Sequence, residues 1–365
     1  MSQGGAAIRF AVVGCGVIGD MHARSIAALG TRARLVLTVD ELADRAEKLA
    51  LEHATEHATS VAEALARDDV DAVAVCTPSG LHAETAVAAL EAGKHVVVEK
   101  PLDVTVEAVR RVRAAERRSG RTVTVISQHR FDPASQLVHR AIREGRFGRL
   151  TSGVASIAWW RSQGYYDSGS WRGTWRLDGG GALMNQGIHT VDLLVWMLGE
   201  PLEVFGHTGC LAHRGIEVED TAAATIRFAG GALGVIHATT AAYPGLTARL
   251  QVHGDRGSAV IDNDQLTYFH AADPDAEGGP SYGAGGDGNQ AALLLPRAEH
   301  QVATGSDPTA LSDAHIDQYR DFVDAIEHGR PPLVTVAEAG RTLAVVRAIY
   351  DSARTGAPVP LTPSA

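Results

Sequence analysis

Hydrophobic residues in the first third of the chain occur in short runs that end near a glycine, a proline or an acidic residue. The runs "IRFAVVG", "RLVLTVD", "DAVAVCTP", "KHVVVEKP" and "RTVTVIS" predict buried strands. Alanine-rich segments such as "DRAEKLALEH" and "AETAVAALEAGK" lie between them and predict helices. Because alternating strands and helices form a parallel sheet covered on both faces, we expect an α/β domain over residues 1–125.

The pattern changes in residues 126–365. The strand-like segments "LTSGVASIAWW", "AAATIRFAGG", "LGVIHATTAA" and "LTARLQVHG" follow one another mostly without an intervening helix. They predict an α+β domain with a large, open, mostly antiparallel sheet. Helices are expected after "LDGGGALM" and around "HIDQYRDFVDAIEHG", and a surface loop is expected at "DPDAEGGPSYGAGGDGNQ".

Composition restricts the partners and the compartment. The net charge of −10 argues against nucleic acid and anionic membranes as partners. The start "MSQGGAAIRF" shows no signal-peptide pattern, and no run approaches the roughly 18 apolar residues of a membrane span. Cys15, Cys76 and Cys210 have no paired spacing, which predicts a reducing, cytoplasmic setting, no disulfide frame and no metal site.

The segment "VVGCGVIGDMHA" fits the pattern G-x-G-x-x-G at Gly14, Gly16 and Gly19. It follows the first predicted strand and opens a helix, which is the context that this pattern requires in a dinucleotide site. Gly14 would allow the tight turn, Gly16 the approach of a pyrophosphate, and Gly19 close packing of helix on strand. The phosphates would then meet the free N–H groups of the helix N-terminus.

Asp40 ends the second predicted strand at the spacing expected for the residue that binds the adenosine ribose. A carboxylate here would accept hydrogen bonds from ribose hydroxyls and repel a 2′-phosphate, so NAD is expected in preference to NADP. Two alternatives remain open: Asp40 is a solvated acid or caps the helix "ELADRAEKLA", and the nearby Arg45 accepts a phosphate.

The stretch "HVVVEKPLDV" ends a strand with Lys100 against Pro101. Ligands of open parallel sheets bind outside the carboxyl ends of the strands, so Lys100 is expected on the same edge as the glycine turn. Pro101 restricts the backbone there and would set the direction of the turn.

The segment "NQGIHTVDLLVWMLG" predicts a helix after a glycine turn. Its apolar stripe comprises Ile188, Val191, Val195 and Leu198. A neighbouring face carries Asn185, His189, Asp192 and Trp196. His189 suits proton transfer near neutral pH, whereas Asp192 is expected to be a buried cap or the partner of another side chain.

These motifs resemble the glucose-fructose oxidoreductase / inositol dehydrogenase / MocA-like (Gfo/Idh/MocA) family. The resemblance rests on "GCGVIG", "CTPSGLHAE", "VVVEKPL", "RFDP" and "GGGALMNQGIHTVD" and covers nearly the whole chain. It implies a Rossmann NAD-binding domain at 1–125, and a substrate-binding and oligomerisation domain at 126–365. In that family the lysine of the EKP motif touches both the nicotinamide and the reacting hydroxyl. Lys100 and His189 are therefore the expected catalytic residues.

The resemblance, together with the types and positions of the residues, gives the expected binding residues. The expected cofactor contacts are Gly14, Gly16, Val17, Ile18, Gly19, Asp40, Thr77, Pro78, His82, Glu99, Lys100 and Gln128. The expected substrate contacts are Asn185, Arg130, Tyr165, Tyr166, Trp171 and Arg172, although tyrosine and tryptophan are equally common in cores. The family usually has an aspartate where this chain has Asn185, which can orient His189 or bind a hydroxyl but cannot act as a base.

The predicted function is an NAD-dependent dehydrogenase that oxidises a secondary alcohol of a sugar, sugar derivative, nucleotide sugar or cyclitol. Two alternatives stay open. One is a redox-neutral enzyme that holds NAD tightly and recycles it, and the other is an NAD-responsive regulatory protein on the same fold. By resemblance, the open sheet would pair subunits into a homodimer or homotetramer.

Overall fold

The computed structural model describes residues 6–273, 283, 288–295 and 313–362. The chain forms two compact units. The first contains Met1–Gln128, Trp175–Gly179 and Ser306–Leu343, and the second contains His129–Thr174, Gly180–Gly305 and Ala344–Ala365. Most of the loop predicted at 273–290 lies outside the described residues.

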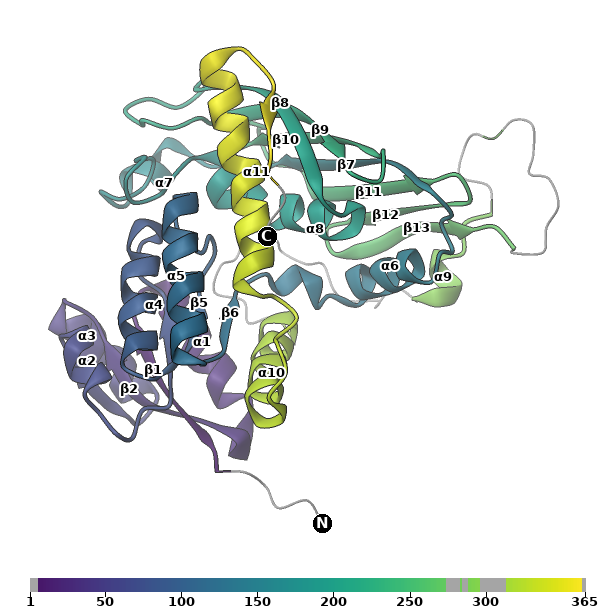
Figure 1. Cartoon of the computed structure of the whole chain (residues 1–365). Coiled ribbons are helices and arrows are strands. Elements are labelled where there is room, and N and C mark those ends of the chain that lie inside the picture. Colours follow the sequence, from purple (N-terminus) through teal and green to yellow (C-terminus); the bar gives the residue numbers. More distant parts are fainter. Residues whose placement is uncertain (1–5, 274–282, 284–287, 296–312, 363–365) are drawn as a thin grey trace. The chain divides into compact units, whose positions relative to one another are not determined.

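The first unit is built on a six-stranded parallel sheet (Figure 1). Its strand order is β3 (Glu56–Ala58), β2 (Ala33–Val39), β1 (Ile8–Val13), β4 (Ala72–Val75), β5 (His95–Val98) and β6 (Val123–Val125). All five predicted strands are confirmed, and β3 is a short addition. The order reverses between β1 and β4, which is where a doubly wound sheet opens a ligand crevice.

Helices connect the strands of this sheet. They are α1 (Val17–Ala27), α2 (Ala43–Glu52), α3 (Val61–Leu65), α4 (His82–Glu91) and α5 (Val106–Ser119). The ends of α5 show how the sequence sets the boundaries. The Thr105 hydroxyl accepts a hydrogen bond from Ala108 N at its start, and Gly120 ends it with a left-handed φ of 64°.

Helix α10 (Asp313–His328) packs in the first unit, whereas the sequence boundary placed it in the second domain. Its apolar residues enter the core of the parallel sheet, where the Tyr319 and Phe322 rings lie 5.7 and 6.1 Å from that of Phe10. A helical apolar stripe shows that a helix will be buried but not which sheet will cover it, so this assignment needed the tertiary structure.

The second unit contains an eight-stranded sheet. Its order is β13 (Gln265–Ala271), β12 (Gly257–Asp262), β11 (Ala248–Gly254), β7 (Leu150–Ala158), β10 (Leu233–Thr239), β9 (Thr221–Phe228), β8 (Pro201–Gly209) and β14 (Val359–Pro360). The pairing is antiparallel except between β7 and β10. The four predicted strands are β7, β9, β10 and β11, and the other four were not identified in the sequence.

Helix α8 (Ile188–Leu198) covers one face of this sheet. Gly153 on β7 permits the close approach, because a Cβ there would lie 2.7 Å from the Leu194 side chain. On the opposite face, Leu233 and Val235 of β10 remain exposed. The unit also contains α6 (Pro133–Arg143), α7 (Gln163–Asp167) and α9 (Ala291–Leu294), while α11 (Val336–Thr355) runs from the first unit into the second.

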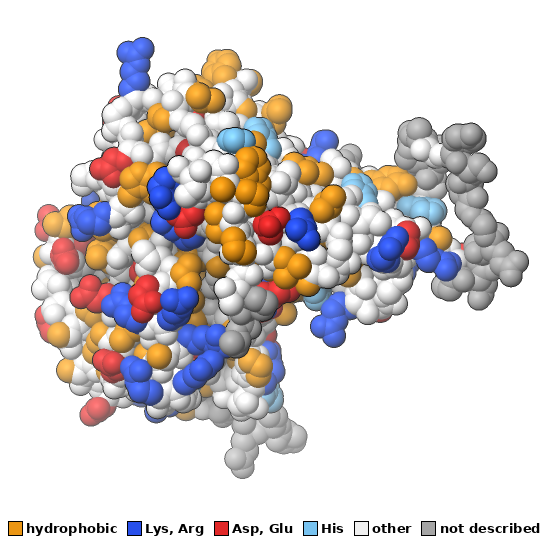
Figure 2. Space-filling model, turned by 45° about the horizontal axis from the view of Figure 1, so that its top comes forward, with side chains coloured by type: hydrophobic (Ala, Val, Ile, Leu, Met, Phe, Trp, Pro, Cys, Tyr) orange, Lys and Arg blue, Asp and Glu red, His pale blue; other side chains and the backbone are white. Residues whose placement is uncertain are grey.

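Surface charges of both signs are mixed on the face seen in Figure 2, where basic and acidic side chains lie beside one another among hydrophobic ones. No helix in the described part of the chain combines the length and the apolar character needed to cross a membrane. Cys15, Cys76 and Cys210 are free thiols.

Candidate active site

The turn between β1 and α1 has the geometry of a phosphate-binding turn. Gly14 has a φ of +98°, and a Cβ there would lie 2.5 Å from the carbonyl oxygen of Cys76. A Cβ on Gly19 would lie 2.0 Å from Gly14 O, whereas a Cβ on Gly16 would meet nothing within 4 Å. No side chain caps the start of α1. Gly16 and the first N–H groups of α1 are thus open to a ligand, which fits a pyrophosphate.

Asp40 connects this turn to the end of β2 through hydrogen bonds. Its Oδ2 accepts a hydrogen bond from Cys15 N at 2.8 Å, and its Oδ1 accepts one from Leu42 N at 3.0 Å. Each carboxylate oxygen can accept a further bond, so this arrangement leaves room for ribose hydroxyls. The role in cofactor choice stays a prediction. Arg45 is exposed, and Leu42, not Asp40, is the N-cap residue of α2.

The loop after β4 is tied to the EKP turn. Both ring nitrogens of the buried His82 lie 2.7 Å from a carbonyl oxygen, Nε2 from Thr77 O and Nδ1 from Pro101 O. Asp103 Oδ2 adds a bond from Ala83 N at 3.1 Å. The predicted cofactor segments at residues 77–82 and 99–101 are therefore held together, with His82 as the link.

Glu99 occupies the buried side of the EKP turn. Its Oε1 lies 2.9 Å from His22 Nε2, and its Oε2 accepts a hydrogen bond from Lys100 N at 2.9 Å. Burial alone would raise the pKa of Glu99, but the His22 hydrogen bond and the nearby charges outweigh it and lower that pKa to about 2. His22 also contacts Tyr319 of α10 through Nδ1 at 2.6 Å.

Lys100 follows this anchored glutamate and is partly exposed, with a cis peptide bond to Pro101. Its backbone position is set on one side by Glu99 and on the other by the His82 contact to Pro101. Lys100 thus stands at the carboxyl end of β5, as expected, in the same unit as the glycine turn.

Two predicted cofactor contacts carry buried polar atoms that lack a partner. Thr77 Oγ1 and Gln128 Oε1 are inaccessible and form no hydrogen bond within the described residues. Such atoms are costly unless a ligand satisfies them. Together with the open Gly16 and the uncapped α1, they show that the residues present fit a dinucleotide.

In the second unit, a π-helical turn at Ala182–Gly187 leads into α8. Between Ala182 and Leu198, only Asn185, His189 and Trp196 are partly exposed. Three of the four residues of the predicted polar face are therefore partly exposed on a segment that is otherwise buried, whereas Asp192 is buried. Turns of π-helix are frequent at functional sites.

Glu219 caps the start of this turn from a distant part of the chain. Its carboxylate accepts hydrogen bonds from Gly181 N at 3.0 Å, Leu183 N at 2.8 Å and the Tyr350 hydroxyl at 3.0 Å. Burial raises the pKa of Glu219 to about 7 despite these donors. Glu219 was not identified from the sequence, because nothing near it in the chain marks it as a cap.

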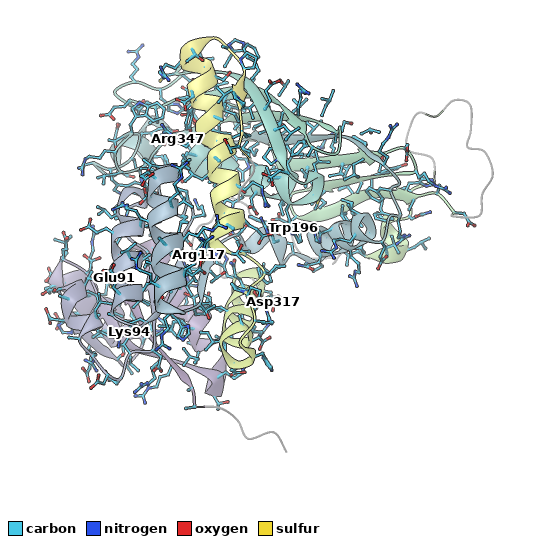
Figure 3. The ribbon with its side chains drawn as sticks, in the orientation of Figure 1. Glu91, Lys94, Arg117, Trp196, Asp317 and Arg347 are labelled. Atoms are coloured by element: carbon cyan, nitrogen blue, oxygen red, sulfur yellow. The ribbon has the colours of Figure 1, made fainter. Side chains whose placement is uncertain are left out.

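Arg130 and Asp192 form a buried bidentate ion pair between the segment before α6 and helix α8. The guanidinium also lies 5.2 Å from the Trp196 ring, and His139 stacks on that ring at 3.7 Å. Trp196 is labelled on α8 in Figure 3. Asp192 is thus a partner of another side chain, as expected, whereas contact between Arg130 and a substrate stays a prediction.

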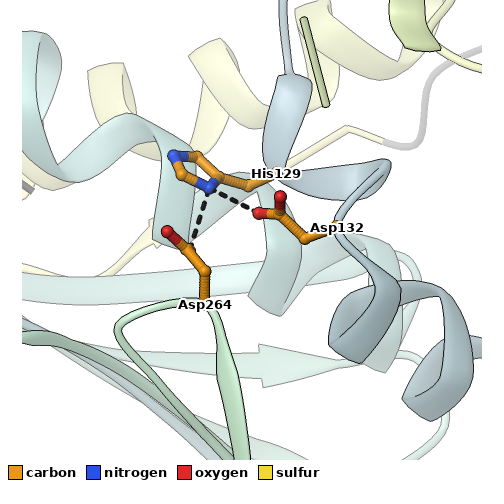
Figure 4. Close-up of side chains that lie close together, drawn as sticks. All are labelled: His129, Asp132 and Asp264. Atoms are coloured by element: carbon orange, nitrogen blue, oxygen red, sulfur yellow. Dashed lines mark hydrogen bonds and ion pairs between the residues drawn. The ribbon is translucent and has the colours of Figure 1, made fainter. Parts of the chain in front are cut away.

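His129 lies beside His189, with ring centroids 5.1 Å apart and planes at 83°. Its Nδ1 faces Asp132 Oδ2 at 2.8 Å and Asp264 Oδ1 at 3.0 Å (Figure 4). Burial would lower the pKa of His129, but the two carboxylates raise it well above its usual value. The charge of His129 lowers the pKa of Asp264, whereas burial raises that of Asp132.

A metal ion could also use the Nδ1 and carboxylate oxygens of this cluster, which lie within 4.8 Å of one another. Ligands of one tetrahedral zinc ion would lie about 3.4 Å apart. The 2.8 and 3.0 Å contacts fit a protonated imidazole paired with two carboxylates better.

An arginine–tyrosine network of Arg161, Tyr165, Arg172 and Gln186 stands next to Asn185. Arg172 lies 4.3 Å and Arg161 5.4 Å from the Tyr165 ring centroid. The Tyr165 hydroxyl accepts from Arg172 Nη1 at 2.7 Å and from Gln186 Nε2 at 3.0 Å, and Arg161 Nη2 donates to Gln186 Oε1 at 3.2 Å.

The structure thus brings Tyr165 and Arg172 together, with Trp171 stacked 4.4 Å from the Arg172 guanidinium. Tyr166 instead points into the core, where its hydroxyl bonds Thr240 Oγ1 at 2.8 Å. Arg161 and Gln186 were not identified from the sequence. The run "WWR" directly before the predicted aromatic segment was the available signal for Arg161.

Comparisons with known proteins agree with this geometry. Residues 8–127 match the model of the oxidoreductase family with an NAD-binding Rossmann fold, and residues 135–260 match the GFO/IDH/MocA C-terminal domain. The chain is 28% identical to scyllo-inositol 2-dehydrogenase (NAD(+)) of Bacillus subtilis, covering 97% of this chain and 96% of the relative. It is 33% identical to 1,5-anhydro-D-fructose reductase of Ensifer adhaerens over 82% of each.

Among solved structures, the WlbA dehydrogenase from Bordetella pertussis in complex with NADH and UDP-GlcNAcA superposes with a TM-score of 0.84. It is 33% identical and covers 98% of this chain and 99% of that one. The two family models, the relatives that match over most of the chain, and the glycine turn all support one conclusion. The chain belongs to the Gfo/Idh/MocA family of NAD-binding oxidoreductases, whose members include sugar and cyclitol dehydrogenases.

Proposed function

We propose that this protein oxidises a secondary alcohol of a sugar, sugar derivative or cyclitol with NAD, and that Lys100 and His189 handle the hydroxyl proton. The observation that carries the proposal is the exposure pattern of the turn and helix at 182–198. Asn185 and His189 reach the surface there from a segment that is otherwise buried, except for Trp196. An otherwise buried segment that exposes an imidazole and an amide close together is suited to polar chemistry.

His189 would accept the proton of the reacting hydroxyl, since a neutral imidazole is the usual base near pH 7. Lys100 would hydrogen-bond the same oxygen and stabilise the negative charge that develops on it. Asn185 would bind a neighbouring hydroxyl or orient His189. Bound NAD supplies the electron-pair acceptor, while the protein orients the two reactants and excludes water.

The proton assignment is tested by replacing each residue separately. We expect Lys100→Met and His189→Asn to retain NADH binding, measured by fluorescence, while turnover falls by about 10²–10⁴-fold. Arg214→Met, at an exposed arginine, is the matched control and should leave both quantities unchanged. Near-wild-type turnover in either variant would remove that residue from the mechanism.

The net reaction is tested with the purified protein and a panel of inositols, hexoses, glycosides, sugar phosphates and nucleotide sugars. Reduction of added NAD by one class would establish the dehydrogenase. Copurified NAD, in its oxidised form, with product formed in the absence of added cofactor would instead identify the recycling enzyme. Substitution of Asp40 by Ala should weaken the preference for NAD over NADP.

We also expect a homodimer or homotetramer formed by the open sheet face of the second unit, where Leu233 and Val235 are exposed on neighbouring outward positions of β10. Sedimentation at working concentration tests this, and Val235→Lys should favour the monomer. A monomeric wild-type protein would exclude the arrangement.

A further inference from the structure

The arginine–tyrosine network carries two positive charges that lack an acidic partner. Within the part of the chain that the structure describes, Arg161 and Arg172 donate only to neutral groups: Trp160 O, Gln186 Oε1 and the Tyr165 hydroxyl. Other arginines of the same unit face carboxylates, as the Arg130–Asp192 and Arg227–Glu203 pairs show.

The two charges are also close together. Both guanidinium groups lie over the ring of Tyr165, so their central carbons are within about 10 Å of each other, which is one Debye length at 0.1 M salt. Both side chains are partly buried. Arg161 donates to the buried Gln186, and Gln186 and Arg172 both donate to the Tyr165 hydroxyl. Like charges held in this way destabilise the protein unless an anion occupies the space beside them.

The network is linked by hydrogen bonds to the candidate catalytic segment. Tyr165 receives hydrogen bonds from Arg172 and Gln186, and Gln186 in turn receives one from Arg161. Gln186 belongs to the same π-helical turn as Asn185 and directly follows it. A group bound by the two arginines would therefore lie on the part of the substrate next to the reacting hydroxyl.

We propose that Arg161 and Arg172 form an anion-binding subsite and that the substrate is a sugar carrying a carboxylate or a phosphate, rather than a neutral sugar or cyclitol. Guanidinium groups bind both kinds of anion through paired hydrogen bonds. The aromatic faces of Tyr165 and Trp171 hold the arginines in place by stacking. This inference rests on the proposed function and names its substrate class.

The test is calorimetric titration of the NADH-bound protein with five compounds. UDP-glucuronate offers a carboxylate and phosphates, UDP-glucose only phosphates, glucuronate only a carboxylate, and glucose and myo-inositol no charge. We expect the charged compounds to bind at least 10-fold more tightly than the neutral ones. Tighter binding of UDP-glucose than of glucuronate would identify the phosphate as the bound anion, and the reverse would identify the carboxylate.

The double variant Arg161→Met, Arg172→Met should lose at least 10-fold in affinity for the charged compounds and keep its affinity for the neutral ones. Arg214→Met is the control, and retained NADH binding and melting temperature would show that the variants fold. Arg172→Lys, which keeps the charge, should lose less than Arg172→Met.

Three outcomes would overturn the anion-binding subsite. The wild-type protein binds charged and neutral compounds equally tightly, or it binds none of the charged compounds. Alternatively, the double variant loses the same affinity for all compounds. Failure of the proposed function looks different. A dehydrogenase that turns over myo-inositol and is insensitive to both arginine variants would refute only the anion subsite. Tight binding of a charged sugar without any turnover would refute only the catalytic proposal.

Discussion

Arg130 and Asp192 meet through two hydrogen bonds, Nε to Oδ2 at 2.7 Å and Nη2 to Oδ1 at 2.8 Å, with both side chains almost fully buried. The pair fixes helix α8, which carries His189 one turn before Asp192, against the segment that carries His129. A buried ion pair of this kind keeps the two segments in one relative position, because separating them would leave each charge buried without its counter-charge.

Removing one partner of this ion pair should therefore strongly destabilise the folded protein. We expect Asp192→Asn to lower the free energy of unfolding by about 3–5 kcal/mol, since the guanidinium would stay buried without its counter-charge. Urea unfolding followed by circular dichroism measures the loss. Asp262→Asn, which breaks the more exposed pair with Arg249, should cost no more than about 1 kcal/mol. Equal losses in the two variants would contradict a buried role for the Arg130–Asp192 pair.

Glu99 should give the stability a distinct acid dependence. The folded pKa of about 2 lies below the ordinary pKa of 4.5 for a glutamate, so the ionised form stabilises the fold above pH 4.5 and this contribution disappears as the pH falls towards 2. We expect Glu99→Gln to cost about 3 kcal/mol at pH 7 and almost nothing near pH 2. Unfolding in urea between pH 2 and 7 would reveal the convergence.

Glu116 provides a control of opposite sign. Burial raises the pKa of this glutamate from 4.5 to about 7, so its ionisation opposes folding as the pH rises through that interval. Glu116→Gln should gain stability relative to the wild type between pH 4.5 and 7. A pH-independent difference for both variants would show that neither carboxyl group has a shifted pKa.

Gly16 and Gly19 of the nucleotide turn should respond differently to substitution by alanine. Gly19→Ala would place a Cβ 2.0 Å from Gly14 O, so both the melting temperature and NADH affinity should fall. Gly16→Ala meets no protein atom within 4 Å, so the melting temperature should stay constant while NADH affinity falls at least 10-fold. Unchanged NADH affinity in Gly16→Ala would show that the pyrophosphate does not approach this residue.

Glu219 should be needed for the geometry of the π-helical turn. Glu219→Ala leaves Gly181 N, Leu183 N and the Tyr350 hydroxyl without their acceptor, and each buried donor left in this way costs about 1–3 kcal/mol. We expect a loss of stability of at least about 3 kcal/mol, together with lower turnover. Tyr350→Phe keeps both backbone bonds to Glu219 but also leaves Met184 N without its acceptor, so it should cost about 1–3 kcal/mol, less than Glu219→Ala. Wild-type stability of Glu219→Ala would exclude the cap.

Local patterns in the sequence determined the parallel sheet, its glycine turn and the placement of Lys100. Apolar runs such as "VVVEKP" end where the strand ends, and the side chains that follow must lie at the carboxyl edge of the sheet. Helical spacing alone also put Asn185 and His189 on one face. These features depend on residues a few positions apart, so composition and periodicity were sufficient to predict them.

Contacts between distant segments were decided only by the tertiary structure. Glu219 caps the π-helical turn through Gly181, which lies 38 residues before it in the chain. Asp264 reaches His129 from the β12–β13 hairpin, and Tyr319 of α10 enters the core around Phe10. Arg161 gains its importance from Tyr165 and Gln186, which the helix and the π-helical turn bring beside it. Such partners are selected by packing and by the need to satisfy buried polar groups, and neither leaves a periodic signal in the chain.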